Sequence, residues 1–265
     1  MTINSTPILD AIIKKINDNS LQLASLPSAI IKVNQILANE YVNLHDIAKV
    51  IQGEISLTAR ILRIANSPAI RGSTEVGSIS DAIARLGITL VKNLAIAVSL
   101  TDKFKTHNVT HSALLTVLAE DSIQRSIYGF MVAKYLTPKL NPELALINGL
   151  VSKIGHIITL RYLNNIDPLI SLNDTIEILD KIGDQVTRSL IEKWDLPKTC
   201  ANTILHCEDN EIYNLESYCD VFITVNQYLA YKDNHVTKHS DMWQRIDEII
   251  EDHHEEYVGL VVILA

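Results

Sequence analysis

Aromatic residues and cysteines are scarce in this chain of 265 residues. Aromatics make up only 5% of it, so leucine, isoleucine, valine and alanine carry most of the 47% that is hydrophobic, a composition that suits helices packed on helices. The three cysteines, Cys200, Cys207 and Cys219, are odd in number and show no CxxC spacing. This pattern argues against a disulfide framework, and we expect reduced, partly buried thiols of a cytoplasmic protein.

Positive charge is also in short supply. The chain has 23 lysines and arginines against 31 aspartates and glutamates, which gives a formal net charge of −8. Non-specific binding to nucleic acid or to an anionic membrane needs clustered cations, so this balance disfavours both. No uninterrupted apolar run approaches the roughly 20 residues that a membrane span needs, and no signal peptide is visible. We therefore expect no membrane partner.

The common catalytic motifs are missing as well. The sequence contains no G-x-S-x-G nucleophile elbow, no phosphate-binding P-loop and no G-x-G-x-x-G. Chemistry of those classes is not indicated, and any active centre would have to be built from scattered side chains.

What the sequence does contain is helical spacing of apolar residues, most clearly over residues 51–100. This stretch predicts three short helices. Ser56 is the predicted N-cap of the first, which stops at Asn66-Ser67-Pro68, where the Asn66 amide can bond to backbone across the break. Ser80 is the predicted N-cap of the second, and Gly87 ends it as a left-handed C-cap residue.

The remainder of the chain shows the same spacing and no strand-like alternation long enough to predict a sheet. A long helix is expected from His111 to Thr137, and another runs from Pro142 through Ile158. A further helix opens at Asp174 and is expected to break at Gly183. The predicted fold is all-α, with an N-terminal helical bundle (1–105) packed on a C-terminal helical bundle (106–265) as one integrated unit.

Part of the 51–100 stretch resembles the HDOD family of bacterial signalling domains, which are related to HD-type phosphohydrolases. The resemblance rests on Leu57-Thr58-Ala59 and on the following motif residues: Asn66, Ser67, Ala82, Ile83, Leu86 and Gly87. The family usually has Asp-Pro before the Leu-Thr, and this chain has Glu54-Ile55 there. The resemblance implies that the C-terminal bundle is HD-like.

Three segments of the second half are similar to the core of HD-type metal-dependent phosphohydrolases: Gly149–Gly155, Trp194-Asp195-Leu196-Pro197 and Val225–Ala230. In active relatives the first segment carries a His-Asp metal-binding pair, and the resemblance places Ser152 and Lys153 at those two positions. Serine is a poor metal ligand, and a lysine ammonium repels a divalent cation.

The resemblance places the other metal-ligand positions on residues that are also altered. They fall on Asp184, on the pair His206-Cys207 and on Asn226. Too few ligands converge for a metal site, so we expect no catalytic residue, no metal and no cofactor. The altered positions would line a decayed pocket.

The resemblance therefore implies a non-catalytic bacterial signalling protein in the cytoplasm, which binds another signalling protein or a nucleotide-like small molecule. A residual metal-dependent HD-type phosphohydrolase is the enzymatic alternative. A helix-turn-helix formed by Ser80–Leu86 and a helix from Thr89 onward would bind DNA. That second helix becomes apolar after Asn93, whereas a recognition helix presents polar side chains to the groove, so nucleic acid is the weaker alternative.

Overall fold

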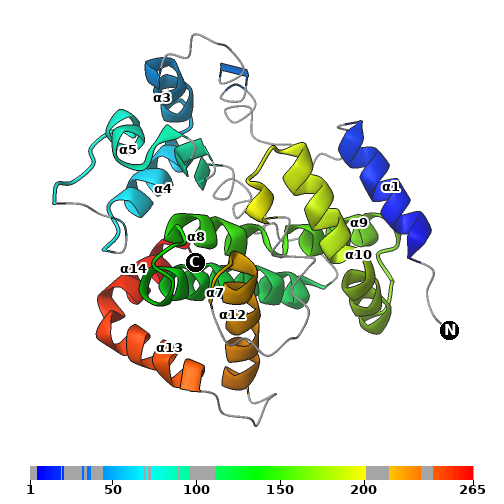
Figure 1. The fold of residues 1–265 in the computed structure, drawn as a ribbon. Coiled ribbons are helices and arrows are strands. Elements are labelled where there is room, and N and C mark those ends of the chain that lie inside the picture. Colours follow the sequence, from blue (N-terminus) through cyan, green and yellow to red (C-terminus); the bar gives the residue numbers. More distant parts are fainter. Residues whose placement is uncertain are drawn as a thin grey trace. The chain divides into compact units, whose positions relative to one another are not determined.

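The structure is a computed structural model that describes residues 5–18, 20, 32, 35–36, 44–68, 70, 73–88, 90–92, 94–95, 111–200, 215–233 and 241–264. Every regular element in these ranges is a helix (Figure 1). The predicted all-α class is thus confirmed. Contacts between residues divide the chain into two compact units, each described below by itself.

Unit 1 comprises residues 1–25 and 103–249. Its helices are α1 (Thr6–Asn17), α7 (Ser112–Leu136), α8 (Pro142–Val151), α9 (Ile154–Ile166), α10 (Leu172–Lys193), α12 (Tyr218–Lys232) and most of α13 (Asp241–Asp252). α7 packs along α8 and α12, and α10 packs along α9 and α1. The centre of this unit is filled by fully buried side chains such as Phe130, Ile147, Ile157 and Val186.

Unit 2 comprises residues 26–102 and 250–265. Its helices are α3 (Leu44–Gln52), α4 (Ile55–Ala65), α5 (Ile79–Leu86) and α14 (His254–Leu264). The first three contact one another, and α14 packs against α4. Ile47, Ile61, Ile79 and Leu94 are completely buried in its core.

The two units differ from the predicted halves, 1–105 and 106–265, at both ends of the chain. The first helix groups with the second half of the sequence because α1 packs against α10. The last sixteen residues group with the first half because α14 packs against α4. Folding of the chain as one integrated unit stays a prediction.

Two predicted helix caps were wrong by two residues. α4 begins at Ile55 after Glu54, so Ser56 lies inside the helix. α5 begins after Ser78, whose Oγ accepts from the Asp81 N–H at 3.1 Å and donates to the Asp81 carboxylate at 2.7 Å. This reciprocal pair satisfies a free donor of the first turn, so the cap is Ser78 instead of Ser80. Gly87 does end α5 with a positive φ of 80°, as expected.

The predicted helix from Pro142 through Ile158 is interrupted and forms α8 and α9. At the break the Ser152 N–H bonds to the Gly149 carbonyl at 3.1 Å, and the Ser152 hydroxyl donates to the same oxygen at 2.7 Å. A serine that bonds to local backbone in this way competes with continued helix. Lys153, with φ −107° and ψ 10°, then starts α9.

The break predicted at Gly183 is absent, since α10 runs without interruption from Leu172 to Lys193. A Cβ at position 183 would lie 2.6 Å from the His156 ring. The glycine is therefore a close-packing position that lets α9 and α10 approach, and this packing offsets its low helix propensity.

Within the described ranges, Pro142–Ile166 is the one helical stretch whose length and apolar composition would suffice to cross a membrane. Sequence analysis did not single it out because Ser152 and Lys153 interrupt its apolar run. Of its most apolar window, 78% is buried inside the protein, as expected for core helices.

Candidate functional site

The segment from Gly149 to Gly155 sits where three helices of unit 1 come closest. A Cβ on Gly149 would lie 2.3 Å from the Cα of Ser126 on α7. A Cβ on Gly155 would lie 2.2 Å from the backbone nitrogen of Thr187 on α10, and the Gly155 N–H donates to the Thr187 hydroxyl at 2.9 Å. The two glycines hold the Ser152-Lys153 turn between α7 and α10.

Two cationic side chains meet the carboxylates around this turn. Lys153 is half-buried. Burial lowers its pKa, and the Arg125 guanidinium on α7 lowers the pKa further, while the carboxylates of Asp121, Asp184 and Asp180 raise it. The net effect is a reduced pKa of Lys153, so the carboxylates do not fully offset the effects of burial and of Arg125.

Arg125 links two of the helices around the turn. Its Nε contacts the Asp121 carboxylate at 2.8 Å, one turn back on α7. Its Nη1 donates to the Asn226 side-chain oxygen on α12. Asn226, which the resemblance placed at an aspartate ligand position, therefore serves as a neutral acceptor for an arginine.

His156 lies one turn beyond Lys153 on α9 and is only 6% exposed. Burial, then Lys153 and Arg125, lower its pKa to about 3, so the imidazole is neutral at pH 7. Its Nε2 lies 3.7 Å from an Asp184 oxygen, which is too long for a hydrogen bond, and a neutral ring makes no ion pair. Burial also raises the pKa of Asp184, although Lys153 and Arg125 oppose this shift.

These residues do not fit a divalent metal ion. The Ser152 hydroxyl is committed to the Gly149 carbonyl, and both Lys153 and Arg125 place positive charge beside the remaining carboxylates. Within the described part of the chain, no three His, Cys, Asp or Glu side chains cluster to hold a metal. A metal ion would be a third cation beside Lys153 and Arg125, where burial and Arg125 already lower the pKa of Lys153.

The structure places the predicted pocket residues as follows. Lys153 and Asp184 lie in one charged cluster, and Asn226 joins the cluster through Arg125. Ser152 is buried in the turn beside it. His206 and Cys207 lie outside the described residues.

The family-motif residues of unit 1 are structural. Trp194 is 2% exposed at the end of α10, and Pro197 follows in the next turn. Between them Asp195 has φ 52°, which marks the sharp reversal after the helix. The Trp-Asp-Leu-Pro segment therefore forms the turn that ends α10.

Among the family-motif residues of unit 2, Asn66 joins the end of α4 to the backbone of Val76. The Asn66 amide donates to the Val76 carbonyl at 2.8 Å, and the Asn66 carbonyl oxygen accepts from the Val76 N–H at 2.7 Å. The predicted bridge from Asn66 to backbone across the break is therefore confirmed. Ser67, Ala82 and Ile83 are buried. The other two residues of this motif are Leu86, which is half-buried, and Gly87.

Asn66→Ala is expected to lower the free energy of unfolding by about 1–3 kcal/mol, because Val76 is 3% exposed and would lose both partners. Urea titration followed by circular dichroism measures the change. Asn165→Ala, at an exposed helical position, is the control and should stay within about 0.5 kcal/mol of wild type. Equal midpoints for the two variants would show that the Val76 bonds contribute nothing.

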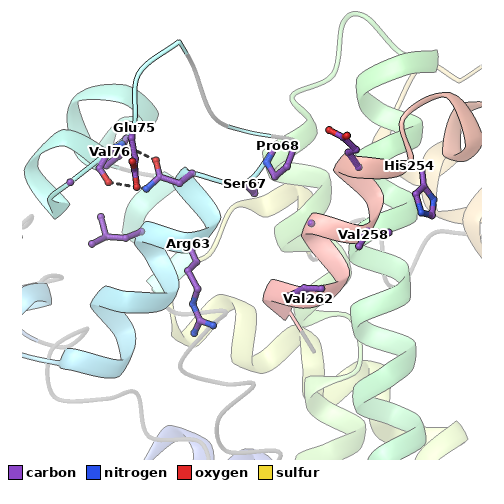
Figure 2. A pocket seen from close by; sticks show the side chains of 13 residues that line it. Arg63, Ser67, Pro68, Glu75, Val76, His254, Val258 and Val262 are labelled. Atoms are coloured by element: carbon purple, nitrogen blue, oxygen red, sulfur yellow. Dashed lines mark hydrogen bonds between the residues drawn. The ribbon is translucent and has the colours of Figure 1, made fainter.

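A groove with a volume of about 890 Å³ adjoins this motif within unit 2 (Figure 2). The motif residues Asn66, Ser67 and Pro68 line one side together with the end of α4, and α14 lines the other from His254 to Val262. Sequence analysis did not find the groove, since the two sides of the groove are nearly two hundred residues apart in sequence.

Arg125 and His156 were also missed. A single arginine in a long helix and a single histidine in an apolar one carry no distinctive spacing. The available signal was the i, i+4 pair of Asp121 and Arg125, which is common on exposed helix faces.

The fold is all-helical. At its HD-like centre, the side chains of Lys153 and Arg125 lie at or beside the positions that the resemblance assigns to metal ligands. The sequence profile of the HDOD domain matches residues 23–210. The chain therefore belongs to the HDOD domain family.

Solved structures with the same fold come from several bacteria. A proposed metal-dependent phosphohydrolase from Shewanella amazonensis SB2B superposes with a TM-score of 0.75 at 18% identity, over 98% of this chain and 99% of that one. An HDOD domain protein of unknown function from Geobacter sulfurreducens gives 0.54 at 19% identity, over 92% and 88% of the two chains. A proposed signal transduction protein from Marinobacter aquaeolei VT8 gives 0.59 at 17% identity, over 98% and 66%. The TM-scores show that these proteins share the fold of this chain.

A curated relative is an uncharacterized protein from Treponema pallidum (strain Nichols). It is 22% identical over 210 residues, which cover 76% of this chain and 39% of that protein. The chain thus matches well under half the length of this relative.

Proposed function

We propose that this chain is a non-catalytic regulatory protein of the bacterial cytoplasm that acts by binding a signalling protein. The observation that carries the proposal is the Lys153–Arg125 cluster at the centre of the HD-like unit. A hydrolytic metal site needs convergent anionic or neutral ligands, whereas here two cations lie among the carboxylates and a buried serine is committed elsewhere.

Membership of the HDOD domain family supports a regulatory role. The similar Marinobacter protein, described as a proposed signal transduction protein, agrees with this role. The similar Shewanella protein, described as a proposed metal-dependent phosphohydrolase, instead favours the enzymatic alternative. An assay of hydrolysis therefore distinguishes the two.

Purified protein is expected to release no more phosphate, and to open no more cyclic dinucleotide, than the metal salt alone. The assay uses cyclic dinucleotides and nucleoside phosphates with manganese, iron or magnesium. Turnover above this blank that disappears in Asp184→Asn would reject the non-catalytic proposal, because the activity would then depend on the HD-like centre. Lys181→Ala, which alters an exposed pair on the same helix, is the matched control.

A nucleotide-like ligand is the second candidate, and one observation favours it. The Arg125 guanidinium helps to lower the pKa of Lys153, and an anion beside the two cations would relieve this repulsion. Binding of inorganic phosphate or of a nucleotide should then raise the pKa of Lys153, measured by NMR of the 13C-methylated lysine. An unchanged pKa at millimolar phosphate and nucleotide would exclude this candidate.

A further inference from the structure

The two sides of the groove in unit 2 approach each other closely where Gly259 of α14 meets Pro68. A Cβ on Gly259 would lie 2.9 Å from Cδ of Pro68, so only glycine lets α14 approach Pro68 this closely. Away from this contact the sides separate, and Figure 2 shows Arg63 extending from α4 across from Val258 and Val262 on α14. Both residues of this contact line a cleft whose volume is about 890 Å³.

The α14 side of the groove is apolar and uncovered. Val258 and Val262 are four residues apart, so they lie on one face of the helix, and they are 39% and 71% exposed. Leu62 on α4 lines the groove opposite them. An exposed row of aliphatic side chains bordered by polar groups is typical of a protein-binding surface.

The charged residues known to line the groove are mostly acidic. Glu75 and Glu255 line it and are exposed, and among the lining residues that the structure describes Arg63 is the single lysine or arginine. Glu251 and Asp252, the last two residues of α13, add negative charge near the start of α14. A partner that complements this surface carries aliphatic side chains flanked by lysines or arginines.

We propose that the groove binds an amphipathic helix of a partner protein. The aliphatic face of that helix packs on Leu62, Val258 and Val262, and its basic residues lie beside Glu75 and Glu255. A helix laid into an apolar groove is an established mode of recognition, in which side chains spaced i, i+3, i+4 and i+7 supply the anchors. The inference rests on the proposed function, since it names the surface and the partner chemistry through which a non-catalytic protein would act.

Synthetic peptides test the proposal directly. The probe is a fluorescent peptide of about 18 leucines and lysines with leucine at i, i+3, i+4 and i+7. A second peptide has glutamate in place of lysine, and a third has the leucine–lysine composition in scrambled order. We expect fluorescence anisotropy to show saturable binding of the first peptide and at least about tenfold weaker binding of the other two.

Val262→Glu is expected to weaken binding of the first peptide at least about tenfold, because a carboxylate would be buried against leucine. Glu255→Lys should weaken it by a similar factor through like-charge repulsion. Both positions are exposed, so the fold should be retained, as circular dichroism will verify. Val117→Glu, at a 58% exposed position in unit 1, is the matched control and should bind as wild type does.

Three results would overturn the assignment. They are equal binding by Val262→Glu and wild type, equal binding of the leucine–glutamate peptide, and sedimentation of the wild type as a dimer that Val262→Glu dissociates. The last result would assign the groove to a second copy of this chain. Hydrolysis by the HD-like centre is measured separately and does not involve Val262, so failure of the groove assignment is distinguishable from failure of the proposed function.

Discussion

Gly149→Ala is expected to lower the free energy of unfolding of unit 1 by about 3 kcal/mol or more, at or above the upper end of the range for overpacking a core. The added Cβ would lie 2.3 Å from both the Cα and the backbone nitrogen of Ser126. These are backbone atoms of α7, so no side-chain rotation relieves the overlap. α7 and α8, which pack along each other, would have to move apart.

Urea unfolding followed by circular dichroism measures this effect. Gly77→Ala is the matched control, because the nearest atom to a Cβ there is an Asp81 carboxylate oxygen at 3.9 Å. It should stay within about 0.5 kcal/mol of wild type. If Gly149→Ala unfolds at the same urea concentration as Gly77→Ala, then α7 and α8 do not approach as closely as described.

Acidification from pH 7.5 to pH 5.5 is expected to cost the protein about 1.4 kcal/mol of stability through His156 alone. The folded state holds the pKa of this imidazole at about 3, because the ring is buried beside Lys153 and Arg125. The unfolded chain binds a proton near pH 6.5 and the folded chain does not. The contribution of the neutral His156 to the free energy of unfolding is therefore fully present above the pKa of histidine in the unfolded chain. It falls as the pH drops below that pKa.

Asp184 acts in the opposite direction. Its raised pKa means that the folded state gains its proton first, which offsets part of the loss from His156 as the carboxylate titrates. Comparison with a variant that lacks the His156 imidazole separates the two contributions.

His156→Gln removes the titrating group, so its urea midpoint should change with pH by about 1.4 kcal/mol less than that of wild type. Asn165→Ala, at an exposed helical position, keeps His156 and is the control, which should keep the wild-type pH dependence. Parallel pH profiles for wild type and His156→Gln would contradict the burial of a neutral imidazole.

Local sequence patterns predicted the helices well where one pattern decided the structure. The long α7 followed from apolar spacing that stopped at Thr137-Pro138, and the Asn66 bridge followed from a helix stop that leaves backbone groups to satisfy. The caps at Ser78 and Glu54 were missed because neighbouring serines offered equally good local candidates. Gly183 was misread as a break because its reason, the His156 ring, belongs to another helix.

The candidate site was predictable only in part. The resemblance identified Ser152 and Lys153 from one contiguous segment, and the structure adds what they bond to and what surrounds them. Arg125 comes from a helix about 30 residues earlier, and its role depends on the packing of α7 against α8 and α12. No spacing rule in the sequence encodes that packing.

Direct titration of manganese into the purified chain tests the central claim, that cations have replaced the metal site of the HD-like centre. Calorimetry at pH 7.5 is expected to show no saturable binding up to millimolar manganese, because Lys153 and Arg125 lie beside the remaining carboxylates. Saturable binding of one or two manganese ions with a micromolar dissociation constant, lost in Asp184→Asn and kept in Lys181→Ala, would contradict the account.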